Sequence, residues 1–170
     1  KNQITTFSLC LSLLKFITAN GQELTTKDYQ YKDFNELQIS HTFSVEVTQG
    51  DDFKVSVEYP EKLEDDINVS FIEHELRFEI KGMHNSKIGP TAKVQMPVLE
   101  EIEVSGAASL KINEFKGEIL DVDIAGAFSV DGMLNYNTIK IEGSGASNIE
   151  LSGSAKSTKL FLSGASNFEG

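Results

Sequence analysis

The amino-acid sequence predicts an all-β fold, namely a single-stranded right-handed parallel β-helix (a solenoid) with coils of about 20 residues and an irregular N-terminal cap. Two observations predict it: one short phrase returns four times, and alternating apolar and polar residues precede each copy. The central glycines are Gly106, Gly126, Gly145 and Gly164, so the intervals between them are 20, 19 and 19. A near-constant interval of this length indicates units that bury a shared core by stacking on their neighbours.

The alternation predicts one strand before each glycine and a shorter strand after it. Ile102 and Val104 alternate with Glu101 and Glu103 ahead of the first copy, and the same pattern precedes the other copies. Period-two alternation is typical of a strand with one buried face. The alternative is an antiparallel sandwich whose hairpins resemble each other, but sandwiches lack a fixed period of this kind.

The repeated phrase predicts a sharp corner in each coil. Glycine suits a corner where φ is positive or where the backbone of the next coil comes close. The following alanine is expected to stack inward as a small residue, and serine or asparagine to bond to nearby backbone. Stacked copies of Asn148 and Asn167 are expected to form a polar ladder. The predicted corner residues are Gly106, Gly126, Gly145, Gly164, Ala107, Ala127, Ala146, Ala165, Ser109, Ser147, Asn148, Ser166 and Asn167.

These repeats, preceded by a charged strand-rich segment, resemble the family called putative auto-transporter adhesin, head GIN domain. The resemblance covers residues 34–170, and the Ser-Gly-Ala-Ser copies are its most specific part. Two copies depart slightly, since Ala108 is inserted in the first and Phe128 replaces a small residue in the second. The resemblance implies a β-helical protein secreted by a Gram-negative bacterium and gives support to adhesion. It brings no catalytic residues to this chain.

The N-terminal residues are expected to be a processing segment. A positive start at Lys1, an apolar run from Ile4 to Ile17 and the small residues of Ala19-Asn20-Gly21 fit a signal peptide at residues 1–21. The alternative is an N-terminal amphipathic helix. Residues 22–33 are expected to be a polar lead-in to a single domain at residues 34–170.

Residues 34–98 are expected to form the cap and first coils of that domain, and residues 99–170 its Gly-Ala-Ser repeats. Four strand-like runs lie in residues 34–80, separated by turn signals and an acidic loop at residues 61–66. They fit either a small antiparallel sheet or irregular coils of the same solenoid. We expect the second, because a solenoid needs atypical ends that cover its core and its open edges.

Composition limits the partners of the protein. The 170 residues carry a formal net charge of −11, with a pI of about 4.7. This charge argues against nucleic acids and anionic membranes, because attraction to phosphate dominates non-specific binding to both. The single cysteine, Cys10, rules out an internal disulfide. The longest apolar run is too short to span a membrane.

The outward carboxylates are the remaining candidates for chemistry. Asp121 and Asp123 are expected to point outward, with Glu101 and Glu103 one coil away on the same face. Such a stripe offers the oxygen ligands that Ca²⁺ prefers, but outward strand positions are polar by default. Asp121 and Asp123 are therefore only candidates, and we expect no metal and no cofactor. His41, His74 and His84 lie too far apart in the sequence to predict a zinc site.

The sequence as a whole predicts a non-enzymatic module, exported to the periplasm or cell surface, that acts as an adhesin or scaffold. Its expected partners are a glycan or a surface protein, with self-association through the solenoid ends as a further expectation. One alternative is a polysaccharide lyase or hydrolase that uses Asp121 and Asp123 on its outer face. Another is a periplasmic ligand-binding or sensory module.

Overall fold

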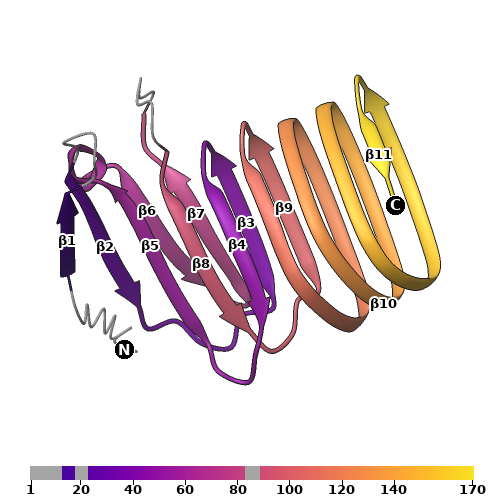
Figure 1. Ribbon diagram of the computed structural model, residues 1–170, viewed down its shortest axis with the longest axis horizontal. Helices are drawn as coiled ribbons and strands as arrows, with labels where there is room; N and C mark the ends of the chain where they lie inside the picture. Colours follow the sequence, from indigo (N-terminus) through magenta and orange to yellow (C-terminus); the bar gives the residue numbers. More distant parts are fainter. Residues whose placement is uncertain (1–12, 18–22, 83–88) are drawn as a thin grey trace, which may run out of the picture.

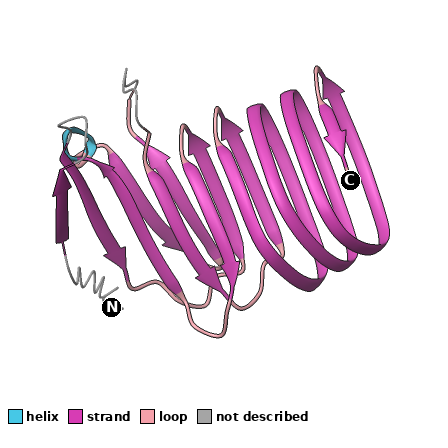
Figure 2. Ribbon diagram, viewed as in Figure 1, coloured by secondary structure: helices cyan, strands magenta, loops and turns pink. Residues whose placement is uncertain are grey.

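The computed structural model describes residues 13–17, 23–82 and 89–170, and almost all of them lie in strands (Figures 1 and 2). Period-two alternation produces these strands, as the sequence predicts. The only helix among them is a single turn of 3-10 helix, η1 (Glu61–Leu63), which follows Pro60. The strands are β1 (Leu13–Ile17), β2 (Glu23–Tyr29), β3 (Glu36–His41), β4 (Ser44–Gln49), β5 (Lys54–Pro60), β6 (Ile67–Ile72), β7 (Glu75–Ile80), β8 (Thr91–Met96), β9 (Glu101–Gly106), β10 (Ser109–Gly164) and β11 (Asn167–Glu169).

The strands form one curled sheet with the shape of a half-barrel. Its order is β1-β2-β5-β8-β4-β10-β9-β3-β7-β6, and β11 pairs with the end of β10. The 56-residue β10 bends repeatedly, so that its successive passes lie side by side along the long axis (Figure 1). The sheet therefore has two walls, one containing β4, β5 and β8 and the other containing β3, β7 and β9, which are joined through β10.

The prediction of a single-stranded right-handed parallel β-helix is wrong, because strand pairing is mixed. Strand β2 is antiparallel to β1 and β5, strand β5 is antiparallel to β8, and β6 is antiparallel to β7. The remaining pairs are parallel: β3 with β7 and β9, β4 with β8 and β10, and β10 with β9 and β11. Alternation identifies a strand and its buried face, but it is the same for both pairing directions.

A single hydrophobic core fills the space between the walls. Side chains at alternate positions of β3 to β9 and of the first passes of β10 point inward, and Leu37, Ile39 and Ile102 are almost completely buried. Aromatic pairs join segments that are far apart in the sequence: the ring centroids of Phe34 and Phe53 are 4.8 Å apart, and those of Phe43 and Phe78 are 5.6 Å apart. Burial of these side chains supplies the main driving force for the half-barrel.

Aromatic side chains connect the two walls at the N-terminal end of the sheet. Tyr31 stacks on Tyr29, with the ring centroids 5.8 Å apart, and lies 6.0 Å from Phe71 of β6. Its hydroxyl donates a 3.0 Å hydrogen bond to the carbonyl of Val69. Tyr31 thus ties the segment after β2 to β6, and this end of the core is covered by antiparallel strands and aromatic rings.

The corner glycines lie against each other across successive passes of the chain. Gly126 is in parallel register with Gly106 and has φ +128°. A β-carbon at Gly126 would overlap the carbonyl of Gly106, so only glycine fits there. The expectation that the following alanines point inward is wrong, because Ala107, Ala127 and the other two are exposed. The next residue is buried instead at Ala108, Phe128 and Ser147, and Ser166 is half-buried.

A further copy of this corner lies between β3 and β4. Residues 36–41 pair in parallel with residues 101–106, and residues 44–48 pair with 109–113. His41 is therefore opposite Gly106, and it has φ 66°, the left-handed conformation that the glycines supply elsewhere. Because His41 replaces glycine, the repeat in the sequence does not reveal this copy.

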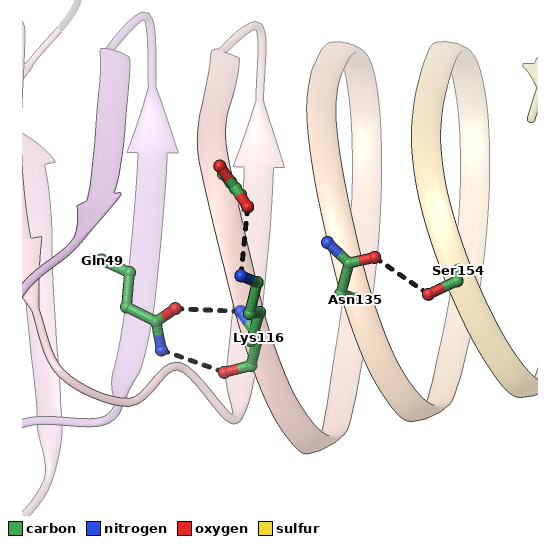
Figure 3. Close-up of polar contacts among 5 residues, drawn as sticks. Gln49, Lys116, Asn135 and Ser154 are labelled. Carbon is green, nitrogen blue, oxygen red and sulfur yellow. Dashed lines mark hydrogen bonds and ion pairs between the residues drawn. The ribbon is translucent and has the colours of Figure 1, made fainter.

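The bends at the other edge of the half-barrel are joined by polar contacts (Figure 3). The side-chain amide of Gln49 bonds to both backbone groups of Lys116, and Ser154 Oγ donates to Asn135 Oδ1 over 2.9 Å. Side chains thus satisfy backbone groups where the chain turns out of the sheet.

The predicted boundaries at residues 21, 33 and 98 remain predictions. Most of the proposed signal peptide, residues 1–12 and 18–21, lies outside the described residues, as does His84. Strand β1 falls within the remaining part of that segment and pairs antiparallel with β2. Strands β3 to β8, where the sequence predicts a cap and irregular coils, are integral parts of the mixed sheet.

Candidate functional site

Six carboxylates lie on the outer surface of the wall formed by β3, β9 and β10, and we call them the acidic face. In one row across the strands, Glu36 is in register with Glu101, and Glu101 with Asp121. Two residues further along each strand, Gln38 is in register with Glu103, and Glu103 with Asp123. Neighbouring strands are about 4.8 Å apart, so each row places its acceptors at that spacing. The acidic face consists of Glu36, Glu101, Glu103, Asp121, Asp123 and Glu142.

Two basic side chains on the same wall are paired with carboxylates. Arg77, the only arginine of the chain, contacts Glu75 at 2.8 Å, and Lys140 contacts Glu142 at 2.9 Å. These partners raise the pKa of the Arg77 guanidinium and of the Lys140 ammonium, mainly through the hydrogen bonds to Glu75 and Glu142. Both cations are thus held by carboxylates of their own strands.

The two rows of the acidic face end differently. Asp121 is followed one repeat later by Lys140 and then by the exposed Lys159, so the first row becomes basic. Asp123 is followed by Glu142 instead, so the second row stays acidic for longer. Negative charge is therefore concentrated where β3, β9 and the first passes of β10 meet.

Glu101 lies among four other carboxylates of the acidic face, and their negative charges disfavour its ionised form. Partial burial raises the pKa of its carboxyl above the ordinary value of 4.5, and the charges of Glu36, Glu103, Asp121 and Asp123 raise it further. Both effects disfavour the charged form. A cation placed beside Glu101 would relieve that repulsion.

A groove of about 830 Å³ runs over the acidic face and ends at exposed apolar side chains. Glu103, Asp123 and Glu142 line it, and so do Ser105, Ser144 and Ser163. At the end of the groove the side chain of Phe161 is 59% exposed and that of Leu160 is 38% exposed. The groove thus combines a row of hydrogen-bond acceptors, a row of hydroxyls and an accessible aromatic ring.

The structure brings together the four carboxylates that the sequence singles out. Asp121 and Asp123 lie outward beside Glu101 and Glu103. Sequence reasoning missed Glu142 and Phe161, although the repeat contains both: Glu142 occupies the position of Asp123 in the next copy, and Phe161 occupies it in the copy after that. Within the described ranges, no three His, Cys, Asp or Glu side chains are grouped in a way that could hold a metal ion.

Eight of the thirteen predicted corner residues, but not the four glycines or Ser166, line a second, shallower groove of about 520 Å³. It contains the exposed alanines and also Ser109, Asn148 and Asn167. Asn167 donates a 3.0 Å hydrogen bond to Asn148 Oδ1, which is the contact that a ladder of stacked asparagines requires. Ser166 Oγ donates to the carbonyl of Ser163, and Ser147 is buried. Asn148, Asn167 and Ser166 are thus hydrogen-bonded to neighbouring residues at the corner.

Comparison with models of known protein families shows which family the chain belongs to. Residues 33–170 match the family described as Putative auto-transporter adhesin, head GIN domain. The protein belongs to this family. The match begins just before β3 and covers every parallel strand pair of the half-barrel.

Solved structures share the fold at low sequence identity. A putative adhesin from Bacteroides fragilis NCTC 9343 is similar with a TM-score of 0.79 and 22% identity, covering 86% of this chain and 70% of that one. A putative adhesin from Parabacteroides distasonis ATCC 8503 has a TM-score of 0.59 and 20% identity, over 78% and 66% of the two chains. A putative lipid binding protein from the same strain has a TM-score of 0.60 and 15% identity, over 80% and 68%.

No curated protein matches the sequence. In the part of the chain that the structure describes, no helix has the length and apolar character needed to cross a bilayer.

Proposed function

We propose that the protein is a non-enzymatic adhesin-like module, exported to the periplasm or cell surface, and that the groove over the acidic face is its ligand-binding surface. Membership of an adhesin family and structural similarity to putative adhesins support the adhesin-like role. The groove supports the location, because it joins a row of carboxylates to an exposed aromatic ring on one side of a rigid sheet.

The chemistry of the groove suits a surface macromolecule. Carboxylates and serine hydroxyls accept hydrogen bonds from the hydroxyls of a glycan or from the polar groups of a protein. The exposed ring of Phe161 offers a flat apolar contact of the type that contributes strongly at interfaces. The groove crosses several strands, so an elongated ligand would contact successive passes of β10.

A binding assay with matched variants tests this proposal. The full chain is measured against immobilised glycans, matrix proteins and whole cells, with and without calcium. The groove variant replaces Glu103, Asp123 and Glu142 by Gln, Asn and Gln. The control variant replaces three exposed carboxylates on the other wall, Glu58, Asp131 and Glu169, by Gln, Asn and Gln. Both variants therefore have the same net charge.

We expect selective, saturable binding that the groove variant loses and the control variant retains. Equal retention by both variants would exclude the acidic face as the binding surface. Turnover of a polysaccharide that disappears when Asp121 and Asp123 are replaced would instead support the carbohydrate-active enzyme. Far-UV circular dichroism of every variant checks that the sheet remains folded.

A further inference from the structure

The charge of the groove identifies the class of ligand that it fits. Its acceptor row runs through Glu103, Asp123 and Glu142, and Gln38, in register with Glu103, donates a 3.0 Å hydrogen bond to the Glu103 carboxylate. The parallel row of Glu36, Glu101 and Asp121 lies immediately beside it. Together these rows place six carboxylates on one wall, of which Glu142 is paired with the ammonium of Lys140 and the other five exceed the positive charge beside them.

This arrangement favours a ligand that carries several positive charges in a line. A divalent metal ion needs oxygen ligands that converge on one point, whereas here they follow a flat sheet at intervals of about 4.8 Å. A neutral ligand would leave the repulsion around Glu101 in place. A row of cations would neutralise it along the groove, which is the complementarity that steers charged partners together.

We propose that the groove binds an extended, lysine- or arginine-rich segment of a partner protein. This inference rests on the proposed function and specifies its ligand. Side chains on one face of an extended peptide recur every ~6.6 Å, about 2 Å more than the spacing of the carboxylates. The long flexible stems of lysine and arginine absorb this difference. A rigid cationic polymer with a different repeat lacks that freedom.

The end of the groove suits the same partner. The exposed ring of Phe161 is next in the row after Glu142 and lies beside Leu160. An aromatic face attracts an ammonium or guanidinium group, and an apolar surface accepts the aliphatic stem of the same side chain. A basic residue at one end of the peptide would therefore contact Phe161 while its neighbours pair with Glu142 and Asp123.

Fluorescence anisotropy with defined peptides tests the inference. The probe is a labelled ten-residue peptide of alternating lysine and serine, compared with the same peptide carrying glutamine in place of lysine. A labelled cationic amino-sugar oligomer of similar length forms a third arm. All are titrated with the full chain, with the groove variant and with the control variant of equal net charge, at low salt and at higher salt.

We expect the lysine peptide to bind and the glutamine peptide not to bind. The groove variant should lose about tenfold or more in affinity, because three exposed ion pairs disappear. The control variant should lose about twofold or less, because surface charges on the far wall are screened beyond ~10 Å at 0.1 M salt. Replacing Phe161 by Ala should weaken binding by roughly two- to fivefold.

Four results would overturn the inference. Equal losses in the groove and control variants would show attraction to net charge alone. Equal binding of the glutamine peptide would remove the role of charge, and binding of the amino-sugar oligomer without the peptide would assign the groove to a glycan. If the lysine peptide does not bind, but the parent protein binds cells and the groove variant does not, the proposed function stands and only the basic-peptide ligand is wrong.

Discussion

The side-chain amide of Gln49 bonds to both backbone groups of Lys116, a residue in a distant part of the chain (Figure 3). Its Nε2 donates to the carbonyl of Lys116 over 3.0 Å and to that of Pro97 over 2.9 Å, and its Oε1 accepts from the Lys116 amide over 3.1 Å. One side chain therefore fixes the end of β4 against the first bend of β10 and against the segment after β8.

Replacing Gln49 by Leu should destabilise the half-barrel. The change removes three hydrogen bonds and leaves backbone groups at two bends without these partners, so the free energy of unfolding should fall by about 1–3 kcal/mol. Urea denaturation followed by circular dichroism measures it. Ser154→Ala is the control, because it removes one exposed contact with Asn135 and should stay within about 0.5 kcal/mol of the parent. A similar, small loss for both would contradict a structural role for Gln49.

Gly126→Ala should be among the most damaging small substitutions in the chain. The new β-carbon would meet the carbonyl of Gly106, and φ +128° is unfavourable for any L side chain. Strain and overlap together should cost roughly 2–5 kcal/mol of unfolding free energy. Thermal and urea unfolding test this against Ala127→Ser, which changes an exposed neighbour and should be nearly neutral. Equal stabilities would show that the passes of the sheet separate easily.

Ser147→Ala should stabilise the protein. The Ser147 side chain is 4% exposed, and its hydroxyl has no hydrogen-bond partner among the described residues. Removing a buried, unpaired hydroxyl avoids its desolvation cost, so the free energy of unfolding should rise by up to about 1–2 kcal/mol. Urea denaturation measures the change. Ser144→Ala, at an exposed position three residues earlier, is the matched control and should have little effect. A loss of stability in the Ser147 variant would show that its hydroxyl is hydrogen-bonded to water.

Glu101→Gln should change how stability depends on pH. Burial, followed by the neighbouring carboxylates, raises the pKa of Glu101 in the folded state above 4.5. The folded protein then binds a proton at pH values where the unfolded chain has released it, so this group reduces stability as pH rises through that interval. The variant lacks this decrease. Unfolding measured across the acidic pH range should therefore show an advantage of the variant that grows upward from the ordinary pKa of a glutamate.

The opposite trend, a variant advantage that disappears as the pH rises, would contradict the repulsion on the acidic face. Glu58→Gln is the control, because it removes an exposed carboxylate from the other wall. Its free energy of unfolding should stay within about 0.5 kcal/mol of the parent, as is usual for an exposed surface substitution.

Tyr136→Phe should cost stability and remove a tyrosine that resists ionisation. The Tyr136 hydroxyl donates a 2.9 Å bond to the carbonyl of Leu99, and burial followed by the charge of Glu100 raises its pKa well above the ordinary 10.0. Leaving the buried carbonyl unpaired should cost about 1–3 kcal/mol. When tyrosine ionisation is followed by ultraviolet absorbance, the parent should show one phenol that ionises only above pH 10.0, and the variant should lack that phenol. Loss of a phenol that ionises near pH 10.0 would contradict the buried environment.

Much of the candidate site could be predicted from the sequence. Alternation places Asp121 and Asp123 outward, and the repeat puts them beside Glu101 and Glu103. The same repeat contains Glu142 and Phe161, but the exposure of an aromatic ring depends on what packs around it. The inward expectation for the corner alanines is wrong because the alternation continues through the corner: Val104 and Ala108 are buried, and Ala107 occupies an outward position between them.

By itself, the sequence determined that the chain forms strands, which face of each strand is buried and where four corners lie. Those features depend on the order of apolar, polar and glycine residues within a few positions. Only the tertiary structure decided the direction of pairing. It placed β5 between β2 and β8, and it brought His41 opposite Gly106, which is distant from it in the sequence. Strands that are so distant in the sequence pair in the direction and register that bury the whole core. The local pattern of apolar and polar residues is the same for either direction and so does not determine it.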